Sequence, residues 1–317
     1  MPNSMLSMLL AAMAASLAAP AVVGAQDAAR TPIEDATPTP AIKSGHVEVA
    51  GISYFYEIRG HGEPLLLLHG GLGSIDMFQP ILPVLVARRQ IIGIDLQGHG
   101  RTTLGSRPIS LEAMGADLAE ILWQLGYSTV DVVGYSMGAG VAFQLAAQHP
   151  EKVRRLVLVS AGFAQNGFYP EMIGAQAQLS GKMAASMKDT PMYKSYAAVA
   201  PKPDDFPRLL DAMGDFIRKP YDWSADVAKL TMPVMLVYGD SDMFRPEHIV
   251  KFYQLLGGGL RDAGWQREHM SQNRLAILPG LTHYDIFLAP ELTETVLPFL
   301  DQKRRSTNWA DQVGGPK

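Results

Sequence analysis

Three side chains of this 317-residue sequence have the chemistry of an acyl-transfer site: a serine, an aspartate and a histidine, in that order along the chain. Ser136 lies at the centre of the run G-Y-S-M-G at 134–138, and Asp242 and His283 each follow an apolar, strand-like segment. A hydroxyl becomes a strong nucleophile when an imidazole takes its proton and a carboxylate fixes the tautomer of that imidazole. The sequence therefore predicts Ser136 as nucleophile, His283 as general base and Asp242 as the acid.

The segments on either side of Ser136 indicate how its hydroxyl would be presented. Residues 129–133 (T-V-D-V-V) alternate and are β-branched, as in a strand, and residues 141–148 (V-A-F-Q-L-A-A-Q) are typical of a helix that ends before Pro150. A Gly-x-Ser-x-Gly turn between a strand and a helix is a nucleophile elbow, in which the glycines let the two elements approach closely. The positive end of the helix dipole would face an oxyanion formed at Ser136.

Four further apolar segments are predicted strands, and a loop with chemically useful residues follows each of them. These are 64–68 followed by H-G-G-L-G-S, 90–94 followed by D-L-Q-G-H-G-R, 233–238 followed by G-D-S-D, and 274–278 followed by P-G-L-T-H. With these motifs in this order the chain resembles the α/β-hydrolase superfamily, in its branch of small serine hydrolases with a helical cap, over roughly residues 46–302. The resemblance implies an α/β fold: a mostly parallel sheet covered by helices on both faces, with an inserted helical cap.

The resemblance also locates the oxyanion hole and favours one of two candidate acids. In this family two backbone N–H groups hold the oxyanion, which implies those of Gly71 and Met137 here. Asp242 lies in G-D-S-D-M-F-R-P, which matches the family pattern Gly-x-x-Asp-x-x-x-Pro. Asp240 lies nearer the strand end and stays open as the alternative acid, although an aspartate after glycine also favours a turn.

The two ends of the chain have compositions that differ from the middle. Residues 1–25 are predicted to be a signal peptide, because a stretch rich in Leu, Met and Ala ends in the small residues V-G-A. Cleavage there would make Gln26 the first residue and would place the protein in the periplasm or outside the cell, without stable membrane insertion. Because no Lys or Arg precedes Arg30, an uncleaved membrane anchor is the alternative. Residues 26–44 are predicted to be a flexible leader and 303–317 a loose tail.

Between these ends we predict a core (45–162 and 226–302) interrupted by a helical cap (163–225), where the alternation of strands and helices stops. The cap is rich in methionine and aromatic residues, which favours a small-molecule substrate with an apolar acyl or aryl group. Tyr169 and Tyr193 are the predicted substrate-binding residues, since each offers a ring face and a hydroxyl. The polar segment 257–273 is interpreted as a surface loop.

Several other functions are disfavoured by composition and spacing. A formal charge of −4 leaves no basic footprint for nucleic acid, and the absence of cysteine excludes disulfides, thiolate catalysis and Cys-based zinc sites. The spacing of the eight histidines matches no metal site, so neither a metal nor a cofactor is expected, and His69 and His99 are interpreted as backbone braces. The glycines at 134, 138 and 140 imitate the phosphate loop of short-chain dehydrogenases, but no tyrosine has a lysine four residues later.

These observations predict an exported serine hydrolase that cleaves a carboxylic ester or lactone through an acyl-enzyme. A serine at the nucleophile position argues against alkyl-enzyme chemistry of the haloalkane dehalogenase and epoxide hydrolase kind, which uses aspartate in this superfamily. Amidase, carbon–carbon bond hydrolase and perhydrolase activities remain alternatives on the same fold. A binding protein without activity is the alternative from another class, and an intact triad in order argues against it.

Overall fold

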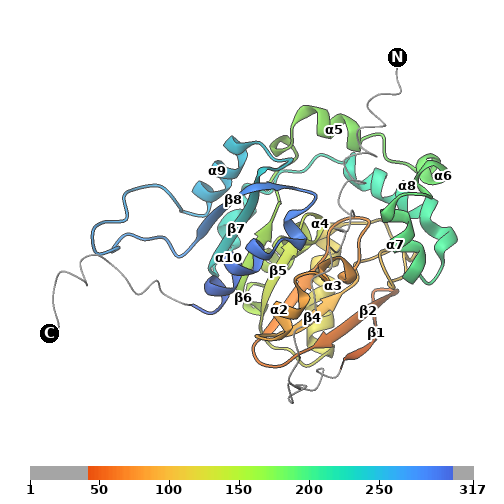
Figure 1. Cartoon of the computed structure of the whole chain (residues 1–317), viewed down its shortest axis with the longest axis horizontal. Helices are drawn as coiled ribbons and strands as arrows, with labels where there is room; N and C mark the ends of the chain where they lie inside the picture. Colours follow the sequence, from red (N-terminus) through yellow and green to blue (C-terminus); the bar gives the residue numbers. More distant parts are fainter. Residues whose placement is uncertain (1–41, 303–317) are drawn as a thin grey trace, which may run out of the picture.

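The computed structural model describes residues 42–302 and has an eight-stranded sheet at its centre (Figure 1). The spatial order is β1-β2-β4-β3-β5-β6-β7-β8, and every pair from β4 to β8 is parallel, whereas β1–β2 and β2–β4 are antiparallel. The strands are β1 (Lys43–Val49), β2 (Ile52–Arg59), β3 (Pro64–Leu68), β4 (Gln90–Ile94), β5 (Val130–Tyr135), β6 (Val153–Val159), β7 (Val234–Ser241) and β8 (Arg274–Thr282). The predicted mostly parallel sheet is confirmed.

The predicted signal peptide, the tail 303–317 and all of the leader except its last three residues lie outside the described residues. The first strand begins at Lys43, so the sheet starts inside the segment predicted to be leader. A two-residue turn at Ala50 and Gly51, with φ of 50° and 77°, joins β1 to β2. Positive φ at both central residues produces the turn twist that suits a hairpin, which explains the glycine there.

Helices cover both faces of the sheet because the side chains of its strands alternate. On β3, Leu66 and Leu68 belong to one buried cluster with α3 and α4, whereas Leu65 and Leu67 belong to a second cluster with α2 and α10. The core helices are α2 (Leu82–Val86), α3 (Leu111–Gln124), α4 (Met137–Gln148), α9 (Pro246–Leu255) and α10 (Pro290–Leu300). The predicted covering of both faces is therefore confirmed.

The segment between β6 and β7 contains helices but no strand of the sheet within the described chain. Figure 1 shows these helices in green to blue-green, with α5 at the top of the view and α6, α7 and α8 at the right. They are α5 (Pro170–Gln176), α6 (Ala184–Met187), α7 (Pro191–Val199) and α8 (Phe206–Ile217). One isolated bridge pairs Ala164 with Asp222 and so joins the two ends of this segment, and a second pairs Phe168 with Phe244 of the core. We refer to residues 163–225 as the cap, with the bounds expected from the sequence.

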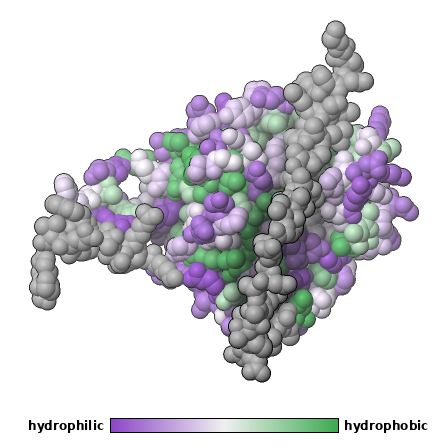
Figure 2. Space-filling view, viewed as in Figure 1, coloured by the Kyte–Doolittle hydropathy of each residue, from purple (hydrophilic) through white to green (hydrophobic). Residues whose placement is uncertain are grey.

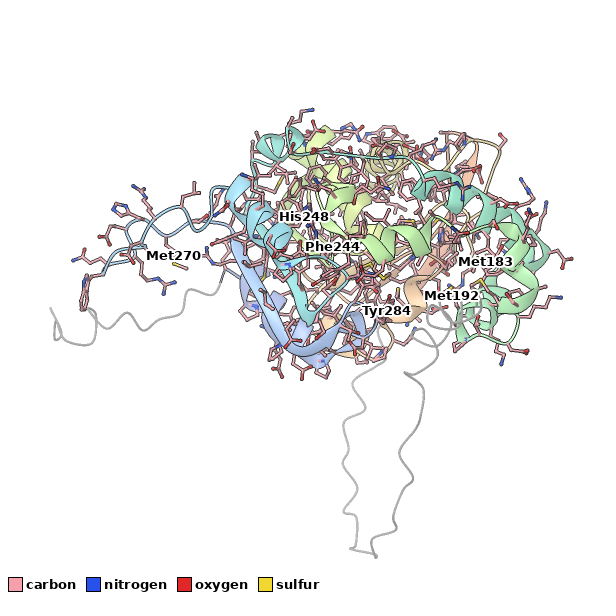
Figure 3. The ribbon with its side chains drawn as sticks, turned by 90° about the horizontal axis from the view of Figure 1, so that it is seen from above. Met183, Met192, Phe244, His248, Met270 and Tyr284 are labelled. Carbon is pink, nitrogen blue, oxygen red and sulfur yellow. The ribbon has the colours of Figure 1, made fainter. Side chains whose placement is uncertain are left out.

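The long connection between α9 and β8 extends away from the rest of the molecule, as Figure 1 shows. Leu260 and Trp265 on this connection are 67% and 76% exposed, and Met270, labelled in Figure 3, lies on the same loop. On the face drawn in Figure 2, apolar residues gather near the middle of the view and polar ones toward the rim.

None of the helices between residues 42 and 302 combines the length and the apolar character that a bilayer span requires.

Candidate active site

Ser136 occupies a sharp turn between β5 and α4. Its backbone has φ 53° and ψ −118°, a conformation that non-glycine residues adopt rarely and that recurs at functional sites. A Cβ placed on Gly134 would lie 2.5 Å from the carbonyl oxygen of Gly138, so glycine at 134 is what allows strand and helix to come this close. The Ser136 amide donates to the carbonyl of Val159 on β6, which fixes the turn to the sheet.

The three residues predicted to act together meet at the C-terminal ends of β5, β7 and β8. His283 Nε2 lies 3.0 Å from Ser136 Oγ, and His283 Nδ1 lies 3.2 Å from Asp242 Oδ1. Both His283 and Asp242 are buried, and the serine is half-buried. The imidazole therefore bridges the hydroxyl and the carboxylate within hydrogen-bond reach, the arrangement that proton removal from a serine requires.

Asp242, and not Asp240, is the carboxylate that faces the histidine. Its Oδ1 also accepts from the Met243 amide at 2.8 Å, and its Oδ2 accepts from the Ser160 hydroxyl at 2.5 Å. Asp240 is exposed, and its carboxylate contacts the Ser241 hydroxyl at 3.3 Å. Asp240 lies within the last residues of β7, whereas Asp242 follows the strand, and only the Asp242 side chain reaches His283 after β8.

Two residues in this constellation were missed by the sequence interpretation. Ser160 is fully buried, has a φ of 51°, and donates its amide to the Val237 carbonyl while its hydroxyl holds Asp242. Tyr135 donates its hydroxyl to the carbonyl oxygen of His283 at 2.6 Å, and burial, with the nearby Asp242 charge, raises the Tyr135 pKa well above its ordinary value. The signal available in the sequence was position, because Ser160 directly follows the apolar run 156–159 and Tyr135 directly precedes Ser136.

The predicted oxyanion-hole residues lie next to each other. A Cβ placed on Gly71 would be 3.9 Å from Met137 Cβ. The Met137 amide is at the first position of α4, where backbone N–H groups have no partner inside the helix. The Gly71 amide donates to no protein acceptor in the part of the chain that the structure describes. Two N–H groups are therefore available beside Ser136, at the positive end of a helix dipole.

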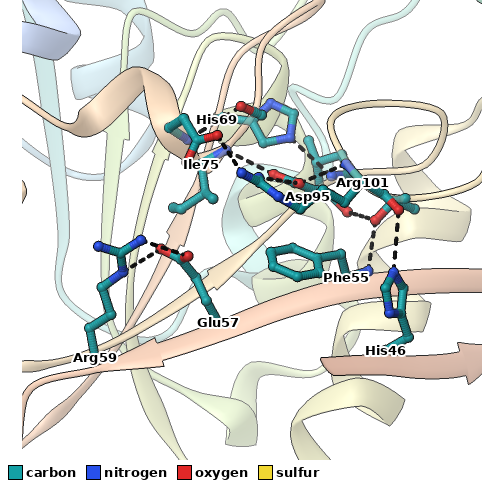
Figure 4. Close-up of polar contacts among 12 residues, drawn as sticks. His46, Phe55, Glu57, Arg59, His69, Ile75, Asp95 and Arg101 are labelled. Atoms are coloured by element: carbon teal, nitrogen blue, oxygen red, sulfur yellow. Dashed lines mark hydrogen bonds and ion pairs between the residues drawn. The ribbon is translucent and has the colours of Figure 1, made fainter. Parts of the chain in front are cut away.

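The loop that carries Gly71 is held by a buried polar network, drawn in Figure 4. His69 accepts from the Leu96 amide at 3.0 Å through Nε2, while its Nδ1 lies 2.7 Å from the Gly70 carbonyl. Burial lowers the His69 pKa to about 4, so the ring is neutral at pH 7 and can make both hydrogen bonds. The Asp95 carboxylate accepts from the Ile75 amide at 2.8 Å and so fixes the far end of the loop. His69 thus contacts backbone, as a brace would.

His99 lies beside this network. Its ring is 5.5 Å from that of His69, and burial lowers its pKa to about 3. The Nδ1 atom lies 2.8 Å from the Gln97 carbonyl, so this imidazole also contacts backbone.

The two predicted substrate-binding tyrosines lie in the cap, but they differ in their surroundings. Tyr169 precedes α5, and its amide donates to the carbonyl of Met243, the residue after Asp242. The ring of Tyr193 packs edge-on against Phe206 at 5.0 Å, within the cap. Both are half-buried. Contact with a substrate stays a prediction for both residues.

Comparison with known proteins identifies the same fold. The family model of the alpha/beta hydrolase fold matches residues 63–188. The sn-1-specific diacylglycerol lipase of Xenopus tropicalis is 35% identical over 147 residues, which are 44% of this chain and 46% of the lipase. An acetyltransferase component of the acetoin cleaving system of Cupriavidus necator is 34% identical over 154 residues, covering 47% of this chain and 41% of that protein. The chain spans less than half the length of these curated relatives, and 43% and 38% of two others.

Solved structures match over most of the chain. A thermophilic esterase from Thermogutta terrifontis superposes with a TM-score of 0.63 at 18% identity, covering 82% of this chain and 98% of the esterase. The N-acyl homoserine lactonase AidH gives a TM-score of 0.62 at 20% identity, covering 84% and 98%. At such identities these structures share the fold, whereas the family model also matches in sequence. The chain belongs to the α/β-hydrolase superfamily.

Proposed function

We propose that this protein is a serine hydrolase that cleaves a carboxylic ester or a lactone through an acyl-enzyme. The observation that carries the proposal is the position of His283, with Nε2 at 3.0 Å from Ser136 Oγ and Nδ1 at 3.2 Å from Asp242 Oδ1. An imidazole placed in this way can take the serine proton while the carboxylate holds its tautomer.

In the proposed reaction Ser136 Oγ attacks the substrate carbonyl as His283 takes its proton. The amides of Gly71 and Met137 donate to the oxyanion of the tetrahedral intermediate, a contribution of roughly 3–4 kcal/mol per donor in a well-formed hole. His283 then protonates the leaving alcohol, which departs and leaves an ester of Ser136. A water molecule, deprotonated by His283, attacks that ester and releases the acid, which restores the serine.

The preference for esters and lactones over other carbonyl substrates rests on two supports. The surroundings of the triad include apolar cap residues such as Phe168, whose ring lies 4.3 Å from that of Phe244, beside the acid. Such walls suit an apolar acyl or aryl group. In addition, the structural neighbours include an esterase and a lactonase, and a curated relative is a diacylglycerol lipase.

A fluorophosphonate probe tests the nucleophile directly, because it labels an activated serine covalently. The wild-type protein should be labelled and the Ser136→Ala variant should not, with both folded by circular dichroism. The substrate class is tested by measuring kcat/KM for p-nitrophenyl esters of graded length beside lactones and anilides. Labelling of Ser136→Ala, or ester turnover by that variant within tenfold of wild type, would rule out this assignment.

We also propose that the protein is exported, from the composition of residues 1–25. Expression of the full chain in a bacterium with two membranes, followed by fractionation and N-terminal sequencing, tests this. Mature protein in the periplasm or medium should begin at Gln26. Protein that keeps residues 1–25 and stays with the membrane fraction would favour the anchor instead.

A further inference from the structure

One side chain of the cap helix α8, that of Met213, approaches the loop that carries Gly71. A Cβ placed on Gly71 would lie 3.2 Å from Met213 Cε and 3.9 Å from Met137 Sδ. The two methionine side chains and Gly71 therefore meet at one point, beside the amides proposed to hold the oxyanion. Met213 is only 4% exposed, so its terminal methyl group is directed into the protein.

A second contact places α8 against the core in the same way. Leu209 lies four residues before Met213, hence on the same face of the helix, and it is fully buried. A Cβ placed on Gly98, in the loop after β4, would lie 3.0 Å from Leu209 Cδ1. Two loops at the C-terminal edge of the sheet thus carry glycine at the positions where one face of α8 approaches. The helix is therefore close to both loops, and Met213 lies over the one that carries Gly71.

The position of α8 is also fixed from the cap side. The guanidinium of Arg218, just after the helix, donates to the carbonyls of Ala177 and Leu179 at 3.2 and 3.1 Å. Within the helix, Asp211 accepts from the Gly181 amide at 2.7 Å. Met213 consequently stands on a helix tied at several points, while its unbranched thioether side chain can adapt to what it touches.

We infer that Met213 is a specificity-determining residue, which limits the size of the substrate group that projects from the carbonyl carbon toward α8. The inference rests on the proposed function and narrows its substrate class to esters or lactones with a small group on that side. A group larger than the space beside the methyl of Met213 would have to displace this side chain or lift α8 from Gly98. A substrate with a small group there binds without either change.

The test compares Met213→Ala with Met187→Ala. Met187 lies in α6, is equally buried in the same apolar cluster, and is not among the nearest neighbours of a Cβ placed on Gly71, so it is a matched control for loss of a buried methionine. For each protein, kcat/KM is measured for p-nitrophenyl acetate, butyrate and octanoate, and for acetate esters of phenol and naphthol. In Met213→Ala the ratio of kcat/KM for the largest substrate to kcat/KM for the smallest should rise tenfold or more in one of the two series. A change of about one methylene in the size of a pocket alters discrimination between substrates by 10-fold or more.

The series that responds identifies whether the acyl or the alcohol group faces α8. Met187→Ala should leave both ratios unchanged. If Met213→Ala is too unstable to assay, a second variant, Met213→Val, takes its place. It keeps bulk near the helix but removes the terminal methyl, and it should change the same ratio in the same direction. Equal changes for small and large substrates in both variants, or the same ratio change in Met187→Ala, would overturn the inference. Loss of all ester turnover by Ser136→Ala remains a separate result, so the two proposals can fail independently.

Discussion

Removal of the Ser160 hydroxyl should slow catalysis without touching the nucleophile or the base. Ser160 Oγ lies 2.5 Å from Asp242 Oδ2, and both residues are buried. This hydrogen bond leaves the other oxygen of the carboxylate directed at His283 Nδ1, 3.2 Å away. In Ser160→Ala the carboxylate loses its hydroxyl partner and can rotate, so the imidazole is held less firmly as it takes the serine proton.

The magnitude follows from the type of bond. A hydrogen bond to a charged group contributes about 1.5–3 kcal/mol, and each 1.36 kcal/mol in the barrier is tenfold in rate. If the transition state loses this much stabilisation free energy, kcat falls by roughly 10- to 100-fold. KM for a small ester should change little, because Ser160 contacts the acid and the sheet.

Backbone strain at Ser160 requires a second variant. The residue has a φ of 51°, a conformation that glycine adopts at little cost. Ser160→Gly removes the same hydroxyl but relieves the strain, so its kcat should fall as in Ser160→Ala while its thermal midpoint falls less. Initial rates with p-nitrophenyl acetate and melting curves measure both effects. Our reasoning fails if kcat stays within about threefold of wild type in both variants, or if glycine restores the activity that alanine loses.

Two other predictions follow from the site. Asp242→Asn should lower kcat by a factor on the order of 10⁴, because an amide can hold the wrong imidazole tautomer. Asp240→Asn should leave kcat nearly unchanged. Steady-state kinetics measure both variants, and swapped phenotypes would make Asp240 the acid. Acid should destabilise the fold, since burial lowers the pKa of His69 to about 4 and of His99 to about 3. Between pH 6.5 and about 4 the unfolded chain binds protons that the native state does not, so the free energy of unfolding should fall by about 3 kcal/mol from His69 alone. Denaturant melts at pH 7, 5.5 and 4.5 measure this, and a flat profile would contradict it.

The sequence predicted much of the fold because strand signals and chain order are local properties. The runs 64–68 and 90–94 coincide with β3 and β4, and the helix ending before Pro150 is α4. The sequence favoured Asp242 over Asp240 as the acid from its spacing to Gly239 and Pro246, and in the structure Asp242 is the aspartate that contacts His283. Chain order along successive parallel strands was enough to expect that these side chains would meet at one edge.

The parts that were missed depend on contacts between distant segments. Met213 is one of 16 methionines, and nothing in its neighbourhood along the chain indicates that α8 brings it to Gly71. Ser160 adopts its positive φ at the end of β6, where its amide donates to Val237 of β7. Nothing in the local sequence indicates this conformation, because a serine that follows a strand does not by itself favour positive φ. The first strand begins at Lys43, two residues before the predicted core, and the sequence did not indicate this because Lys43 and Ser44 lack the apolar alternation that marks a strand.

The position of β8 at the sheet edge has a consequence for how activity would be lost. His283, the proposed general base, directly follows this strand. Because β8 pairs with β7 on one side only, its backbone is held by a single neighbouring ladder. The Tyr135 hydroxyl ties His283 back to the central strand β5 through one hydrogen bond. Edge elements of this kind open locally at lower free energy than the whole fold unfolds. In mild denaturant, therefore, ester turnover should disappear while far-ultraviolet circular dichroism still reports an intact sheet; coincident loss of both signals would show that β8 unfolds only with the rest.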